Sequence, residues 1–449
     1  MATWSGNASG RHEKHKLVCL GQQRRWLLLT LVTTTCGVSG QTAPSSAPSK
    51  PLSFPRIVRH PHPGVWGGDK MTELPRYDTN RRRGGSLDLI NDDLSRLDLN
   101  DRLADLLYAS FDGDTRWPTA DRMPPISQFD PKGIMELGKN PGLGVRSLHK
   151  QGITGKGIAI AIIDSPLLVD HVEYKEHLRL YEEIPRIAEG EANPGWKLSG
   201  INADMHGSAV ASIALGKSVG VAPQADLYYI ATCAAVEGSN RRDFTHHAQA
   251  VERILEVNQM LPADRRIRVI SMSIGWDPID AGFDAIQKAT RRAKESGLLV
   301  ISSSVDVTHG FKFNGLGRDP LADAEKPESY CPGLWWGWSV RNPLFFRLKR
   351  SSPIDRLMVP MDSRTTASQR ATDEYVFHRN GGWSWSVPYI AGLYALAAQV
   401  RPTVTPDAFW RAAWDTGTPF NVRVGQETVC LGRIVNPGEL IRRVARTPT

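Results

Sequence analysis

The spacing of apolar residues divides this chain into two parts near residue 145. In residues 86–112, leucines and one isoleucine lie mostly three or four positions apart with acidic residues between them, which is the spacing of one helical face. Beyond residue 145, short apolar runs alternate with stretches of helical spacing. We therefore predict a main folded domain preceded by a small ordered extension. Its helical spacing is carried by Leu87, Ile90, Leu94 and Leu97, and a similar pattern continues on a shifted face with Leu99, Leu103, Leu106 and Leu107.

Four apolar runs after residue 145 have the length and composition of buried strands. The first, residues 157–163, is apolar throughout, as expected for a parallel strand that is buried on both faces. The alternation of strands and helices predicts an α/β fold with a doubly wound, mainly parallel sheet flanked by helices, and such sheets bind ligands beyond the carboxyl ends of their strands. The other strands are expected at 225–230, 268–273 and 298–301, with helices around 248–255 and 283–294.

Composition excludes several classes of protein. A hydrophobic content of 41% and a charged content of 23% are those of an ordinary globular protein. The net charge of +8 is a mild basic bias without a clustered patch, so we expect no nucleic-acid partner. The wide spacing of the cysteines excludes the tight pairs typical of zinc, and no metal site is predicted from the residues. These cysteines are Cys19, Cys36, Cys233, Cys331 and Cys430, and their pairing stays open.

The N-terminal segment has the pattern of a secretory signal peptide. Basic residues precede the apolar run 26–32, and small residues follow at 38–40. Because the run is too short for a stable membrane span, we expect export to the exterior or the cell envelope, with a buried N-terminal segment as the alternative. The expected divisions are a signal-like segment (1–40), a Pro/Ser-rich linker (41–80), an N-terminal extension of uncertain role (81–144) and the main domain (145–449). Removal of residues 41–144 during maturation stays an open question.

Three short segments place an Asp, a His and a Ser where catalysis needs them. Asp164 ends the first apolar strand, and His206 begins the small-residue run HGSAVAS. Ser384 opens an apolar helix with Pro388 in its first turn, where a missing N–H costs nothing. Taken singly, each has a structural interpretation as a turn residue, a satisfied histidine or a helix N-cap. Together they follow one of the chain orders known for the Asp-His-Ser triad.

The segments around these residues resemble those of the subtilisin-like serine peptidases, the subtilases, over about residues 145–449. The resemblance implies a subtilisin-like fold and a serine endopeptidase that acts on peptide or protein substrates. In that reaction Ser384 attacks the peptide carbonyl to form an acyl-enzyme, His206 transfers the proton and Asp164 orients His206. No cofactor is predicted, calcium is implied by the resemblance only, and a monomer is expected. The matching segments are Asp164-Ser165, HGSAVAS with Gly220-Val221-Ala222-Pro223, and Gly382-x-Ser384-x-x-x-Pro388-x-x-x-Gly392.

The chain departs from the subtilase pattern at the oxyanion hole. The family supplies an Asn side chain after a strand and a run of small residues, and the matching segment here, 296–306, ends at Asp306. An ionised carboxylate cannot donate a hydrogen bond to the developing negative charge. Three alternatives stay open: a protonated Asp306, a hydroxyl donor from Ser303 or Ser304, or a register shifted by one or two residues.

The substrate is expected to contact the segment Ser273-Ile274-Gly275-Trp276. This segment resembles the one with which subtilases pair an extended peptide as an added strand, and it predicts Ser273, Gly275 and Trp276 as substrate-binding residues, with Trp276 shaping a subsite.

Two other functions stay open. The first is a catalytically impaired subtilase that binds peptides or regulates a partner, which Asp306 and the bulky neighbours of Ser384, Trp383 and Trp385, suggest. The second is an esterase that uses the same triad. Comparing the turnover of peptide and ester substrates would distinguish an esterase from a peptidase.

Overall fold

The computed structural model describes residues 52–65, 67–79, 85–185, 202–236, 239–341 and 355–446, and the segment Ser53–Thr449 forms one structural unit. The signal-like segment and residues 41–51 of the linker lie outside the described residues. Among the helices of the described part, none is long and apolar enough to cross a membrane.

A six-stranded sheet, parallel at every pairing, confirms the predicted fold class. Its strand order is β1-β5-β6-β4-β7-β8. β4 is buried along its whole length, and Ala161 lies between Tyr228 of β6 and Ile270 of β7. The strands are β1 (Arg56–Ile57), β4 (Ala159–Asp164), β5 (Leu178–Glu183), β6 (Asp226–Ala231), β7 (Ile267–Met272) and β8 (Leu299–Ser302).

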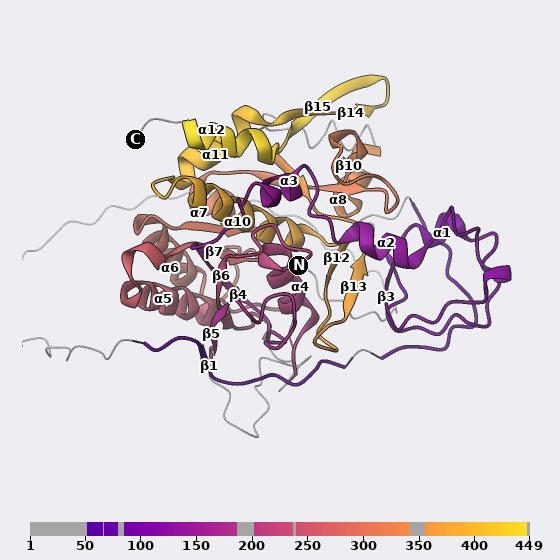
Figure 1. The fold of residues 1–449 in the computed structure, drawn as a ribbon, viewed down its shortest axis with the longest axis horizontal. Helices are drawn as coiled ribbons and strands as arrows, with labels where there is room; N and C mark the ends of the chain where they lie inside the picture. The colour runs from indigo at the N-terminus through magenta and orange to yellow at the C-terminus, as the bar shows by residue number, and fades with distance from the viewer. Residues whose placement is uncertain are drawn as a thin grey trace, which may run out of the picture. The chain divides into compact units, whose positions relative to one another are not determined.

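Two pairs of helices pack on this sheet (Figure 1). α4 (Met205–Leu215) packs on α10 (Trp383–Val400), and α5 (Thr245–Met260) packs on α6 (Phe283–Glu295). α10 is buried from Ser384 to Ala398 because its residues there are apolar or small, and it lies beside β4, β7 and β8 as a core helix. This burial holds the N-terminal end of α10 in a fixed position relative to the sheet.

The extension does not form the helix that its leucine spacing predicts. Within residues 86–112 only Leu103–Leu106 (α1) is α-helical. The reason is local: Asp88, Asp93 and Asp98 each accept a hydrogen bond from the backbone N–H two residues later, and such bonds compete with a helix. The apolar residues nevertheless form one core, which includes Leu74, Leu89, Leu94, Leu99, Leu106, Phe111, Phe129 and Phe377.

Two smaller sheets complete the fold. In the order β12-β13-β3-β2, strand β3 of the extension pairs antiparallel with β13 and so joins the extension to the main domain. The other sheet has the order β10-β9-β11-β15-β14. Their strands are β2 (Leu87–Asp88), β3 (Ala109–Asp112), β9 (Phe313–Arg318), β10 (Tyr330–Pro332), β11 (Leu357–Pro360), β12 (Arg364–Ala367), β13 (Tyr375–His378), β14 (Thr418–Val424) and β15 (Glu427–Ile434). The remaining α-helices are α2 (Pro131–Gly138), α3 (Val145–Lys150), α7 (Val305–His309), α8 (Leu334–Arg341), α11 (Pro406–Thr416) and α12 (Pro437–Arg446).

The contact between α10 and α4 gives the first testable prediction. A Cβ added at Gly392 would lie 2.6 Å from Val221 Cβ and 2.9 Å from the Ala214 carbonyl oxygen. We expect Gly392→Ala to lower the free energy of unfolding by about 1–3 kcal/mol through overpacking, although alanine favours a helix. Urea denaturation measures this change. Gly113→Ala, where the added Cβ meets nothing within 4 Å, is the control, and equal effects at both positions would contradict the close packing.

Candidate active site

Asp164 and His206 meet at the carboxyl edge of the central sheet. β4 ends at Asp164, and α4 begins one residue before His206. The Nδ1 atom of His206 lies 2.6 Å from Asp164 Oδ1. A carboxylate at Nδ1 fixes the proton on that nitrogen, because a carboxylate can only accept. The other nitrogen, Nε2, is therefore the one that can exchange a proton with a reacting group.

The surroundings of His206 favour its charged form. Burial lowers the pKa of His206, but the charge of Asp164, its hydrogen bond and the charge of Asp204 together raise the pKa above its usual value. Nε2 is buried and has no hydrogen-bond partner among the described residues. The ring of Trp385 packs edge-on against the imidazole, with 5.7 Å between the ring centroids. Nε2 is thus shielded from solvent and left without a partner among the described residues.

Ser384 lies in the first turn of α10, after Gly382, whose φ of 62° requires a residue without a side chain. The Ser384 hydroxyl donates to the Ser273 carbonyl oxygen at 3.3 Å, and the Ser273 hydroxyl donates to the Ser384 carbonyl oxygen at 2.9 Å. This reciprocal pair joins the end of β7 to the start of α10. Because the single proton of Ser384 is directed at Ser273, the hydroxyl must rotate before His206 can accept that proton.

The predicted oxyanion position is exposed. Asp306 lies in the first turn of α7, and its Oδ1 accepts a hydrogen bond from the Val307 N–H at 3.0 Å. Ser304 is already engaged, since its hydroxyl accepts from the Trp276 N–H at 3.0 Å and donates to the Trp276 carbonyl at 3.3 Å. Of the two hydroxyl alternatives, Ser303 is therefore the one that stays available. The backbone N–H of Ser384, in the first turn of a helix, is a second donor of the kind that oxyanions use.

The predicted substrate segment follows β7 directly, but its carbonyls already have partners. Ser273 O accepts from Ser384, Ile274 O from the Ser303 N–H, and Gly275 O from Arg242 Nη1 at 2.8 Å. The Trp276 side chain is only 3% exposed and packs on Phe244, with ring centroids 6.0 Å apart. The structure thus brings Ser273 next to Ser384 but places the Trp276 ring in the core.

Arg242 and Asp362 are site residues that the sequence did not reveal. Arg242 comes from the loop after β6, and Asp280 holds its guanidinium with two bonds of 2.7 and 3.1 Å. Asp362 follows β11, and it accepts from the N–H groups of Leu334 at 2.7 Å and Gly381 at 3.3 Å. It therefore connects α8 to the loop that leads into Ser384. Burial raises the pKa of Asp362 to about 6.

Aromatic rings surround the start of α10. Trp383, directly before Ser384, packs on Trp335 of α8 with centroids 5.1 Å apart, and its indole N–H donates to Asn314 Oδ1 at 2.8 Å. Trp385, directly after Ser384, also packs edge-on against His378, with centroids 5.2 Å apart. Burial lowers the pKa of His378 to about 3, so this second histidine is neutral near pH 7. The two tryptophans thus anchor the first turn of α10 to β9, α8 and β13.

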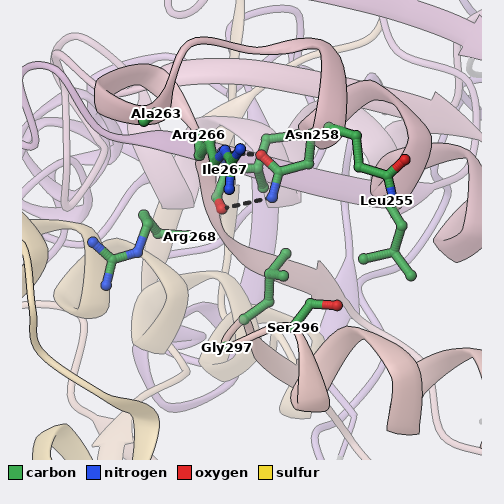
Figure 2. Close-up of a pocket in the computed structure, with 10 residues that line it drawn as sticks. Leu255, Asn258, Ala263, Arg266, Ile267, Arg268, Ser296 and Gly297 are labelled. Atoms are coloured by element: carbon green, nitrogen blue, oxygen red, sulfur yellow. Dashed lines mark hydrogen bonds between the residues drawn. The ribbon is translucent and has the colours of Figure 1, made fainter.

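Neither a metal site nor the cysteines nor the main cavity of the described residues belongs to this site. In the described residues, no group of three or more His, Cys, Asp or Glu side chains could hold a metal ion, and Cys233 and Cys430 are free thiols. A cavity of about 520 Å³ lies at the amino ends of β7 and β8, with Ile267 and Leu298 in its wall (Figure 2). It is at the opposite edge of the sheet from Asp164 and holds no candidate catalytic group.

Part of the chain matches a known protein family. Residues 155–338 match the model of the subtilase family, a range that includes Asp164 and His206 and ends before Ser384. This segment of the chain, which is less than half of its length, is similar to the subtilase family. This likeness supports a serine peptidase in general terms. This confirms the family that the sequence motifs predict.

A curated relative is the "Subtilisin-like protease PopC" of Myxococcus xanthus (strain DK1622), which is 26% identical over 280 residues. The match covers 58% of this chain and 56% of PopC, so it spans little more than half of either protein. Among solved structures, the prenylagaramide maturation protease PagA is 17% identical with a TM-score of 0.44, and the match covers 67% of this chain and 98% of PagA. The PatG macrocyclase in complex with a peptide is 16% identical with a TM-score of 0.45, covering 67% and 95%.

Asp362 leads to a prediction about pH. Its pKa is about 6 in the fold, against 3.8 without burial, so the folded state binds the proton more tightly than the unfolded state. The ionised Asp362 carboxylate therefore lowers the free energy of unfolding, fully so above pH 6. This loss decreases as the pH falls from about 6 towards 3.8, where the carboxyl is protonated in the fold. Asp362→Asn is neutral at every pH. We expect wild type to lose about 2 kcal/mol relative to this variant between pH 4.5 and 7.5.

Urea denaturation of both proteins at several pH values measures this difference. Asp284→Asn, at an exposed position in the first turn of α6, controls for the general effect of removing a carboxylate. A difference between wild type and Asp362→Asn that does not change with pH would show that Asp362 titrates normally.

Proposed function

We propose that this subtilase is a serine endopeptidase that works through an acyl-enzyme. Ser384 is the nucleophile, His206 is the general base and then the general acid, and Asp164 holds His206 in the required tautomer. The observation that carries the proposal is the 2.6 Å contact between His206 Nδ1 and Asp164 Oδ1. It leaves Nε2 without a partner among the described residues, and the imidazole packs on Trp385 in the same turn of α10 as Ser384. PopC, a relative by sequence, is named a protease.

The first step is a rotation of the Ser384 hydroxyl from the Ser273 carbonyl to His206 Nε2. As the hydroxyl oxygen attacks the substrate carbonyl, its proton passes to Nε2, and the imidazolium is stabilised by Asp164. The imidazolium then gives the proton to the leaving amine. The oxyanion is bound by the Ser384 N–H and the Ser303 hydroxyl, which supports a slower reaction than a site with an Asn side chain.

A catalytically impaired, peptide-binding subtilase is the second candidate. One observation favours it: the exposed carboxylate of Asp306 accepts a hydrogen bond where the family has a donor. Export of the protein, suggested by the N-terminal segment, is compatible with either function.

Labelling with a fluorophosphonate tests whether Ser384 is an activated nucleophile. This reagent reacts with a serine only when a base removes its proton. We expect stoichiometric labelling of the full chain, and no labelling of Ser384→Ala or His206→Gln. Mass spectrometry locates the adduct. A folded wild-type chain that is not labelled, at any pH between 5 and 9, would leave the peptide-binding function.

Asp306 gives a second test of the same proposal. Removing one oxyanion donor costs roughly 10²–10³ in kcat, so supplying one at this position recovers part of that factor. We expect Asp306→Asn to raise kcat by tenfold or more on a peptide substrate, with a smaller change in KM. Asp306→Ala, which removes the negative charge but adds no donor, separates the two effects. Equal activity of the Asn and Ala variants would show that no donor is needed at Asp306.

A further inference from the structure

A second carboxylate, Asp204, lies next to the Asp164–His206 pair. Asp204 is the N-cap of α4, and its Oδ1 accepts a hydrogen bond from the His206 backbone N–H at 2.8 Å. The same oxygen accepts from the Ser165 hydroxyl at 2.9 Å. The Asp204 N–H donates to the Pro166 carbonyl at 2.8 Å. The chain before α4 is therefore bound to the turn that follows Asp164.

Ser165 bridges the two carboxylates. Its hydroxyl oxygen lies 3.2 Å from Asp164 Oδ1 and 2.9 Å from Asp204 Oδ1, and it accepts from the Gly207 N–H at 3.0 Å. A hydroxyl has one proton, so it donates mainly to the nearer Asp204. Asp164 Oδ1 accepts instead from the Ser165 N–H at 2.8 Å and from His206 Nδ1.

The first turn of α4 is shaped around this bridge. A Cβ at position 207 would lie 2.3 Å from the Ser165 carbonyl oxygen and 2.5 Å from the Tyr229 hydroxyl, so Gly207 permits the approach. The Tyr229 hydroxyl donates to the same Ser165 carbonyl. Ser165 thus has hydrogen-bonded partners on its amide, its hydroxyl and its carbonyl, and its position is determined on every side.

We propose that Asp204 is a positioning residue of this active site: through Ser165 and the amide of His206 it fixes the catalytic pair, and its negative charge stabilises the imidazolium that forms during the reaction. Its role in catalysis rests on the proposed peptidase function. Its effect on the imidazole does not, because that effect follows from charge and distance alone.

Other groups near the imidazole do not supply this charge. His378 on β13 is neutral near pH 7, since burial lowers its pKa to about 3. Burial raises the pKa values of the Cys233 thiol and of the Tyr229 hydroxyl on β6, so both are also neutral. His247 on α5, which faces Asp164, has a pKa of about 4 through burial. The carboxylates whose charges act on His206 are therefore Asp164 and Asp204.

Asp204→Asn separates charge from geometry. Both hydrogen bonds that Asp204 accepts end on Oδ1, and the carbonyl oxygen of an Asn side chain can accept both. The variant thus keeps the N-cap and the bridge but removes the negative charge. Ser165→Ala is the complementary variant, because it removes the bridge and keeps both carboxylates. Asp284→Asn again controls for a distant loss of charge.

The decisive measurement is the titration of His206 by NMR in the full chain, with ¹³C-labelled histidine and in a Ser384→Ala background. The loss of one resonance in His206→Gln gives the assignment. We expect the titration midpoint to move to lower pH in Asp204→Asn, since a neutral side chain no longer stabilises the imidazolium. We expect no such movement in Ser165→Ala or Asp284→Asn. An unchanged midpoint in Asp204→Asn would overturn the electrostatic role.

Kinetics tests the catalytic part. In Asp204→Asn, the acid limb of kcat/KM should move to lower pH and the plateau should fall about tenfold, as for the loss of one favourable charge interaction. Ser165→Ala should lower the plateau without moving the limb. A shifted titration with no hydrolysis by any form would refute the peptidase function while supporting the electrostatic role of Asp204. A normal plateau in both variants would refute the positioning role.

Discussion

The site depends on how the start of α10 is held against the central sheet. Asp164 and His206 follow β4 and begin α4, whereas Ser384 comes from a helix much later in the chain. Burial of α10 along the sheet sets its direction, and the reciprocal bonds between Ser273 and Ser384 fix its position along the end of β7. Because side chains in a packed core cannot shift freely, this contact fixes where Ser384 lies relative to the sheet edge that carries Asp164 and His206.

The packing around His206 also determines which of its neighbours carry a charge. Two carboxylates lie close to one imidazole, and the neighbouring histidine, thiol and phenol are neutral because they are buried. An imidazole in this setting is a stronger base than one with a single carboxylate, which favours removal of the Ser384 proton. The site thus differs in two opposite ways from one that has a single carboxylate and an Asn donor. Its base, His206, is stronger, whereas its donors to the oxyanion are weaker because Asp306 stands at the Asn position.

The sequence predicts those elements and residues that local patterns and motifs specify. β4 and α10 were predicted because they are apolar throughout, whereas β5 was not, because Glu182 and Glu183 interrupt its pattern; both are paired in the fold with arginines that are distant in sequence. The catalytic residues are predicted from their flanking motifs, and the structure brings Asp164 and His206 together. Arg242 was not, since its role depends on contacts with Gly275 and Asp280 across two loops, which neither spacing nor composition reveals.

Several groups that a peptide would need are used within the protein. The Ser384 hydroxyl donates to the Ser273 carbonyl, the Gly275 carbonyl accepts from Arg242, and the Trp385 ring packs edge-on against the His206 imidazole, whose Nε2 is buried. Exchanging the first two bonds for bonds to a substrate changes the free energy little, because each donor and acceptor regains a partner. Moving Trp385 is different, since it exposes a buried ring and opens a space in the core. Access to His206 therefore depends more on this one ring than on the hydrogen bonds of the cleft.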